Sequence, residues 1–173
     1  LGHAFAVKAN GGEVHEMGIM MLVFTPIPYV DASAALAFRN KWERILVGAA
    51  GMAVELFIAS LALFLWINIE PGNIRSLLYN IIFIAGVSSL LFNGNPLLRY
   101  DSYYILGDFL EIPNLGPRGL QYMGYLVQRY LFRIRDLEPP FSERGERIWF
   151  FIYTVTSFIY RIFIYIAIVL FIA

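Results

Sequence analysis

Three long apolar runs set the pattern of the chain. They are Ile45–Ile67, Ile74–Phe92 and Ile148–Ala173, and each has close to or more than the roughly 20 apolar residues that a helix needs to cross a bilayer. Each run contains a single charged residue. The pattern therefore predicts three membrane-spanning helices.

Two shorter apolar segments precede these runs. Leu1–Ala9 places small and apolar residues around His3, and Asn10-Gly11-Gly12 behind it is a typical helix stop, so we expect the end of a further helix. Met17–Val30 has only about 14 residues, too few for a spanning helix, and its two prolines exclude a regular one. We expect an extended segment that is interfacial or re-entrant, beside a cavity, because non-helical backbone at membrane depth needs protein or water partners.

Two stretches between the second and third runs mix aromatic, aliphatic and charged residues. Tyr103–Leu110 and Leu120–Phe132 are typical of amphipathic helices that lie at a membrane surface. Pro113, Gly116 and Pro117 indicate turns between them.

The composition supports a membrane protein. Hydrophobic residues make up 59% of the chain and charged residues 15%, against roughly 45–50% and 25% in soluble domains. We therefore expect an all-α multi-pass membrane protein, a transmembrane helix bundle with an extended or re-entrant segment after the helix that carries His3. The chain has no initial Met and stops within an apolar run, so we expect residues 1–173 to be a single membrane-embedded core, truncated at the N-terminus and at the C-terminus.

Charge and cysteine content narrow the chemistry. The formal net charge is zero, and no basic patch suits a nucleic-acid partner. The chain has no cysteine, which excludes disulfides and cysteine-based zinc sites. A metal would have to use His3 or His15 together with Asp or Glu side chains.

Basic residues are distributed unequally between the expected loops. If the three runs alternate in direction, Asp31–Arg44 and Gly94–Arg147 share one face, whereas the turn Asn68–Asn73 on the other face has no Lys or Arg. The first face carries Arg39, Lys41, Arg44, Arg99, Arg118, Arg129, Arg133, Arg135, Arg144 and Arg147. The positive-inside rule places this face, with Asp101, in the cytoplasm.

An imidazole and a carboxylate lie beside these membrane-length segments. Ionisable residues there are costly and are functional-site candidates by default. Leu1-Gly2-His3-Ala4 resembles the second half of His-Glu-Leu-Gly-His-Ala, the zinc helix of the site-2-protease-like intramembrane metallopeptidases. In that motif two histidines bind zinc and the Glu is the general base. The resemblance implies that the first His and the Glu would immediately precede Leu1.

The expected third ligand follows an Asn-Pro pair. Asn95-Pro96-Leu97-Leu98-Arg99-Tyr100-Asp101 resembles the bacterial branch of this family, in which the Asp binds zinc and a Gly follows it. Here Ser102 follows Asp101. The resemblance implies a Zn²⁺ ion held by the preceding His, His3 and Asp101.

Two further pieces resemble the same branch. Gly51-Met52-Ala53-Val54-Glu55 takes the place of the family's Gly-Pro-x-x-Asn, and we expect Glu55 and Asn95 beside the ligands. Val23–Asp31 resembles the family's extended segment, to whose edge a substrate would add as a strand.

The resemblance implies an intramembrane zinc endopeptidase that hydrolyses membrane-embedded or membrane-associated protein substrates, in a bacterial inner membrane, with secretion or export components as further partners. Without the upstream His and Glu, the fragment itself would be inactive.

Other interpretations stay open. Met52, Glu55 and Ser102 depart from the family pattern, which favours a non-proteolytic scaffold or exporter subunit of the same fold. Glu55 and Arg161 would line the path of a transporter. His3 alone is compatible with helix packing, Asp101 with an ion pair to Arg99, and Glu55 with a polar helix contact.

Overall fold

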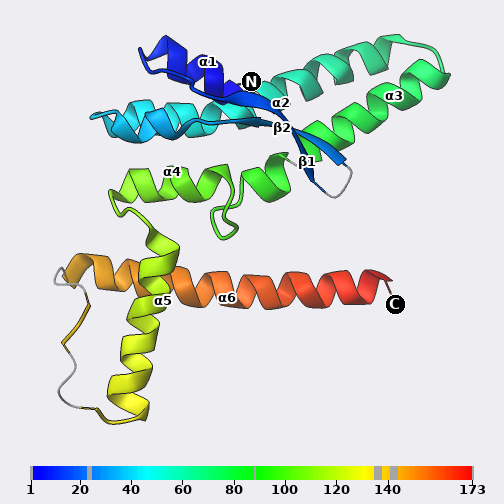
Figure 1. Ribbon diagram of the computed structural model, residues 1–173. Coiled ribbons are helices and arrows are strands. Elements are labelled where there is room, and N and C mark those ends of the chain that lie inside the picture. The colour runs from blue at the N-terminus through cyan, green and yellow to red at the C-terminus, as the bar shows by residue number, and fades with distance from the viewer. Residues whose placement is uncertain (1, 23–24, 88, 135–137, 141–143, 173) are drawn as a thin grey trace. The chain divides into compact units, whose positions relative to one another are not determined.

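The computed structural model describes residues 2–22, 25–87, 89–134, 138–140 and 144–172 (Figure 1). Leu1, Val23, Phe24, Arg135 and Ala173, which enter the predictions above, lie outside the described residues. Helices account for 74% of the chain. The chain divides into two compact units, residues 1–109 and 110–173, and each is described by itself.

The first unit begins with a short helix, α1 (Gly2–Ala9), that ends where the sequence predicts. Gly11 has a φ of 78°, a conformation that costs glycine nothing. The N–H of Gly12 donates to the Val7 carbonyl at 2.9 Å, and that of Gly11 to the Lys8 carbonyl at 3.1 Å. This pair of bonds is the Schellman motif, so the predicted glycine stop is confirmed.

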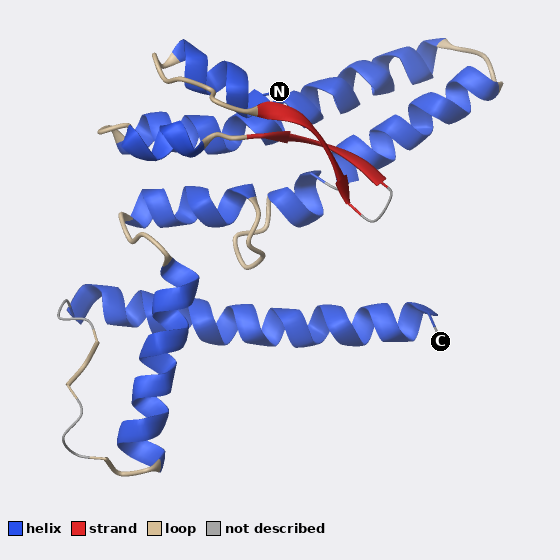
Figure 2. Cartoon of the chain, viewed as in Figure 1, coloured by secondary structure: helices blue, strands red, loops and turns tan. Residues whose placement is uncertain are grey.

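The segment after α1 is extended, as predicted, and forms a hairpin. Strand β1 (Met17–Leu22) pairs antiparallel with β2 (Thr25–Val30), so that Gly18 lies opposite Tyr29 (Figure 2). A sheet of two strands leaves one edge of each strand without a neighbour in the sheet.

A short 3₁₀ helix, η1 (Ser33–Ala37), leads into the long helix α2 (Lys41–Asn68). The side chain of Asn40 accepts a hydrogen bond from the N–H of Trp42 at 3.0 Å, which is the standard N-cap arrangement. Because the cap satisfies a backbone donor that the helix cannot, it fixes where α2 begins.

The chain returns along α2 as a second long helical segment. It comprises α3 (Asn73–Ile81) and then the wider π turns η2 (Ile82–Val87) and η3 (Ser89–Asn93). Such turns often mark functional sites. A loop connects η3 to α4 (Asp101–Leu110), which confirms the helix predicted for Tyr103–Leu110.

The second unit packs two helices. They are α5 (Leu115–Leu126), extended by the π turn η4 (Val127–Leu131), and α6 (Arg144–Ile172). The predicted helix Leu120–Phe132 is thus confirmed, but it begins earlier than expected.

The early start of α5 changes the role of two residues that were predicted to form a turn. Gly116 and Pro117 lie in the first helical turn instead of in a loop. Proline is tolerated there because the first N–H groups of a helix have no partner within the helix.

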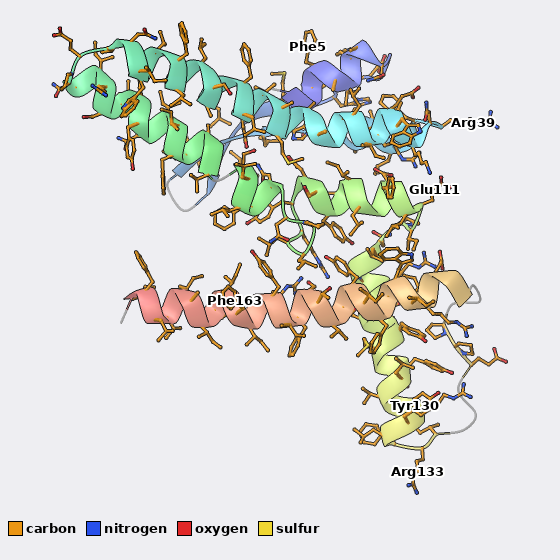
Figure 3. All side chains as sticks on the ribbon, turned by 180° about the vertical axis from the view of Figure 1, so that it is seen from behind. Phe5, Arg39, Glu111, Tyr130, Arg133 and Phe163 are labelled. Atoms are coloured by element: carbon orange, nitrogen blue, oxygen red, sulfur yellow. The ribbon has the colours of Figure 1, made fainter. Side chains whose placement is uncertain are left out.

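Within the described residues, three helical segments are long and apolar enough to cross a membrane: Lys41–Asn68, Asn73–Asn93 and Gly145–Ile172. They match the three apolar runs of the sequence. Most of their apolar side chains are exposed, among them Phe163 of α6, which is labelled in Figure 3. A lipid environment would cover such surfaces.

The core of the first unit joins α1 to α2. Ala6, Val7, Ala35 and Val47 form its buried cluster. Gly2 lies so close to α2 that a Cβ there would overlap the Ala50 carbonyl. Glycine is required at this crossing for steric reasons, and the close approach brings the neighbouring His3 against α2.

Candidate metal site

His3 and Asp101 lie side by side, although one comes from α1 and the other begins α4. The Nε2 atom of His3 is 3.5 Å from Oδ2 of Asp101, and both side chains are about one quarter exposed, at 28% and 26%. The alternative partner for Asp101, Arg99, is exposed. The structure therefore pairs Asp101 with His3.

The imidazole of His3 is oriented by α2. Its Nδ1 lies 2.8 Å from the carbonyl oxygen of Val47. A carbonyl only accepts hydrogen bonds, so Nδ1 carries a proton, and Nε2 is the nitrogen that faces Asp101. Metal-binding histidines usually donate their second N–H to a carbonyl or carboxylate in this way.

The separation of the two side chains suits an ion pair, and it also suits two ligands of one metal ion. Hydrogen bonds of this type span about 2.7–3.2 Å, shorter than the 3.5 Å observed between His3 and Asp101. Two ligands at about 2.0–2.1 Å from a tetrahedral zinc ion lie about 3.3 Å apart.

Gly51 makes room for this pair. A Cβ at Gly51 would overlap the His3 imidazole and would come within 3.1 Å of Oδ2 of Asp101. One turn earlier, a Cβ at Gly48 would lie 2.9 Å from the Ile105 side chain of α4. The two glycines thus let α1 and α4 approach the same face of α2.

Asn95 shapes the loop before Asp101. Its side-chain oxygen accepts the N–H of Leu97 at 2.9 Å, and its carbonyl accepts the N–H of Leu98 at 3.2 Å. These bonds form a turn. The N–H of Asn95 also donates to the carbonyl of Phe92 in η3 at 3.3 Å, so its hydrogen bonds are with this loop and with η3.

Glu55 lies one helical turn beyond Gly51 on α2. Its Oε2 accepts a hydrogen bond from the side chain of Asn93, at the end of η3, at 3.1 Å. Four residues separate Glu55 from Gly51, which places both on one face of the helix. The structure therefore places Glu55 on the same face of α2 as Gly51, where Asn93 is its partner.

A cavity of about 440 Å³ opens beside the pair. Helix α4 lines it from Asp101 through Tyr104 to Asp108, and α1, the end of β2, η1 and α2 contribute to its wall. At the start of η1, Asp31 accepts the backbone N–H of Ser33 at 2.9 Å. Hydrogen bonding to the side chain and backbone of Ser33 holds the pKa of the exposed Asp31 below its usual value.

The sequence analysis missed Arg44. Its Nε donates to Oδ1 of Asp108 at 2.6 Å and its Nη1 to the carbonyl of Phe38 at 2.8 Å, and Arg44 lines the cavity. We had counted it only as a loop charge. Its spacing of four from Gly48 and seven from Gly51 was the available signal, since these positions share one helix face.

His3 and Asp101 would supply two ligands of a metal ion. Within the described ranges, no group of three or more His, Cys, Asp or Glu side chains is placed to hold a metal ion. Structural and catalytic zinc sites normally use at least three protein ligands. The pair thus fits part of a metal site, and a further ligand is needed to complete it.

Comparison of the chain with known protein families, curated proteins and solved structures finds no match.

Proposed function

We propose that this chain is the core of an intramembrane zinc endopeptidase. His3 and Asp101 would hold the metal together with a histidine that precedes Leu1. Bound zinc supplies Lewis-acid chemistry that activates a water molecule for attack on a peptide carbonyl. A glutamate before Leu1 would take up the proton of that water.

The observation that carries this proposal is the His3–Asp101 pair. The two residues come from opposite ends of the first unit, yet their facing atoms are 3.5 Å apart. The hydrogen bond to Val47 leaves Nε2 available, and Gly51 gives the pair space. Together, these three features support a metal site at this pair.

The departures from the family pattern are accommodated locally. Ser102 and Met52 contact each other, with Oγ 3.7 Å from the sulfur, and Glu55 has Asn93 as its partner. None of these contacts displaces His3 or Asp101. This supports the peptidase over the scaffold or exporter subunit, for which these three residues were the main argument.

The strand register bears on how a substrate would dock. Beyond the strands, the N–H of Asp31 donates to the Glu16 carbonyl at 2.9 Å. Bonded and non-bonded pairs alternate along an antiparallel ladder, so every second residue of β2 turns its backbone groups away from β1. These residues are Val30, Pro28 and Pro26. Proline has no N–H, so this outer edge is poor in donors.

The outer edge of β1 contains no proline and therefore keeps its backbone N–H donors. By the same alternation Met17, Ile19 and Met21 turn both N–H and C=O outward. We therefore move the expected docking edge from Val23–Asp31 to β1. A membrane-protein substrate, locally unwound, would add there as a further strand. Unwinding is required because a helix keeps its carbonyls in internal hydrogen bonds.

The proposed location is a bacterial inner membrane, and the arginine distribution supports an orientation with the site toward the cytosol. Three apolar helices of spanning length support a membrane location. Components of a secretion or export system remain candidate partners.

Peptide cleavage with a paired metal assay tests the proposal. The protein is prepared in lipid nanodiscs with His-Glu restored before Leu1, and a fluorogenic peptide with strand-forming sequence is the probe. We expect cleavage that a chelator stops and zinc restores. Changing the upstream Glu to Gln should abolish cleavage and keep the zinc, because that residue handles the proton. Zinc binding without cleavage by the unchanged protein would favour the non-proteolytic alternative.

A further inference from the structure

One face of α2 contacts all the segments that carry or flank Asp101. Arg44, Gly48, Gly51 and Glu55 follow one another at spacings of four, three and four residues. At 3.6 residues per turn these four positions lie within about 60° of one another around the helix. The face is charged at both ends and has only glycines between.

The partners of this face run in the opposite order along the chain. Arg44 bonds Asp108, Gly48 lies against Ile105, and Gly51 lies against Asp101. Glu55 bonds Asn93. The first half of α2 and α4 are therefore antiparallel, and the loop that leads to Asp101 is attached to α2 before and after it.

The contact after Asp101 is a partly buried ion pair. The side chains of Arg44 and Asp108 are 19% and 24% exposed, and the bond measures 2.6 Å. Because Arg44 also donates to the carbonyl of Phe38, it joins α4 and the end of η1 to α2. A planar guanidinium suits such double contacts better than an ammonium.

The contact before Asp101 fixes the end of η3. Asn93 is the last residue of the π turns, and its amide binds Glu55. The N–H of Gly94 donates to the Ser89 carbonyl at 2.8 Å. The loop from Gly94 to Tyr100 therefore starts from a position set by α2.

We infer that Arg44 and Glu55 are positioning residues: from one face of α2 they clamp the two segments that flank Asp101, and so hold its carboxylate at metal-ligand distance from His3. This inference rests on the proposed metal site. Neither Arg44 nor Glu55 is a proposed ligand of the metal.

The glycines of this face explain why the side-chain contacts of Arg44 and Glu55, here called the clamps, are needed. Glycines at 48 and 51 let α4 approach α2, but a glycine holds nothing in place because it has no side chain. Metal sites lose affinity steeply when a ligand is displaced, and mutation of supporting residues typically costs about 10- to 100-fold. The contacts of Arg44 with Asp108 and of Glu55 with Asn93 fix the position of these segments on α2, which the glycines alone cannot do.

Zinc affinity is the first test, measured by chelator competition on the protein with His-Glu before Leu1. Arg44→Gln and Glu55→Leu should each weaken binding about 10- to 100-fold. Glu55→Gln should have a much smaller effect because its amide oxygen still accepts from Asn93. Arg39→Gln, which removes an exposed arginine just before α2 (Figure 3), is the control and should change affinity less than about twofold.

Two further variants separate positioning from general stability. Asp108→Asn removes the ion pair but keeps the Arg44 contact with Phe38, so it decides the question if Arg44→Gln does not fold. Arg44→Glu combined with Asp108→Arg restores the attraction with reversed sign and should recover affinity relative to Arg44→Glu alone. In the Co²⁺-loaded protein, Arg44→Gln should alter the visible absorption bands, which report ligand geometry. Unchanged bands together with unchanged affinity in all clamp variants would overturn the inference.

A metal-free signal distinguishes failure of this inference from failure of the proposed function. The chain has two histidines, so ¹⁵N-histidine NMR gives few signals, and His15→Gln identifies those of His3. Without metal, Arg44→Gln and Glu55→Leu should shift the His3 imidazole signals, whereas Arg39→Gln should not. A protein that binds no zinc but shows these shifts would refute the metal site and support the clamps. A protein that binds zinc normally in every variant and shows no shifts would refute the clamps alone.

Discussion

Each of the two units has a glycine at which a neighbouring segment approaches closely, but the consequence of that approach differs between the units. In the second unit, a Cβ at Gly119 of α5 would overlap the Thr154 hydroxyl and approach the Phe150 carbonyl of α6. In the first unit, a Cβ at Gly51 would overlap His3 and approach Asp101. A glycine that admits a neighbouring helix is thus ordinary packing in one unit, and it creates a candidate site in the other because the groups admitted are ionisable.

The two units also contain ion pairs of similar geometry in different surroundings. Arg118 and Glu146 are joined at 2.6 Å, as Arg44 and Asp108 are, and all four side chains are about one fifth exposed. Arg118 also lies over the Phe150 ring, with 4.9 Å to the ring centre, so its pair closes a helix interface. Arg44 instead lines a cavity. The geometry of an ion pair does not reveal its role, whereas its surroundings do.

The largest expected effect comes from adding one methyl group to each glycine. Gly51→Ala should lower zinc affinity by at least about 100-fold, because the new Cβ displaces a ligand. Gly119→Ala should leave zinc affinity unchanged and lower the free energy of unfolding by about 1–3 kcal/mol through overpacking. Chelator competition and denaturant unfolding measure the two quantities. Equal losses of zinc in both variants would remove the distinction between the units.

An effect of intermediate size on peptide cleavage is expected from substitutions at the two strand edges of the first unit. Ile19→Pro removes an outward N–H from β1 without touching the ladder to β2. It should lower kcat/KM for peptide cleavage about 3- to 10-fold, the value of one hydrogen bond. Pro28→Ala adds an N–H to the outer edge of β2 and should not lower cleavage. If Pro28→Ala changed cleavage strongly and Ile19→Pro did not, the substrate would dock on β2.

A smaller effect is expected from the ion pair of the second unit. Arg118→Gln should reduce the free energy of unfolding by about 1 kcal/mol, since the pair is partly exposed and Glu146 keeps access to water. Zinc affinity should stay the same, in contrast to Arg44→Gln. A loss of zinc in Arg118→Gln would mean that ion pairs act on the site through global stability.

The smallest effect concerns the residue after Asp101. Ser102→Gly introduces the family's residue into the first turn of α4 and should cost about 0.5 kcal/mol of stability from helix propensity. Zinc affinity should hardly change, because the Ser102 hydroxyl is directed to the sulfur of Met52. A large gain in zinc affinity would instead show that Ser102 distorts the site.

Much of the fold follows from the sequence because it depends on local pattern. Runs of apolar residues of spanning length fix the long helices, and two adjacent glycines fix the end of α1. The pairing of β1 with β2 could not be predicted, since register depends on contacts between strands. The sequence suggested only an extended chain there.

The site was predicted in part, for a similar reason. Because the segments around His3 and Asp101 resemble motifs of one family in the same order, the two residues were expected to lie together. The contacts of Glu55 with Asn93 and of Arg44 with Asp108 join residues far apart in the chain, which no local pattern reveals. Asn95 was expected beside the ligands, but its side chain forms the turn before them.

Zinc stoichiometry tests the central claim most directly, namely that His3 and Asp101 hold one metal ion. In protein with His-Glu before Leu1, elemental analysis should find about one zinc per chain, and His3→Ala or Asp101→Ala should each lose most of it, because zinc is rarely held by two protein ligands. Asp101→Asn should lose less than Asp101→Ala, since an amide oxygen still coordinates. His15→Ala, which changes the exposed second histidine, should keep the metal. Full zinc content in both His3→Ala and Asp101→Ala would contradict the account.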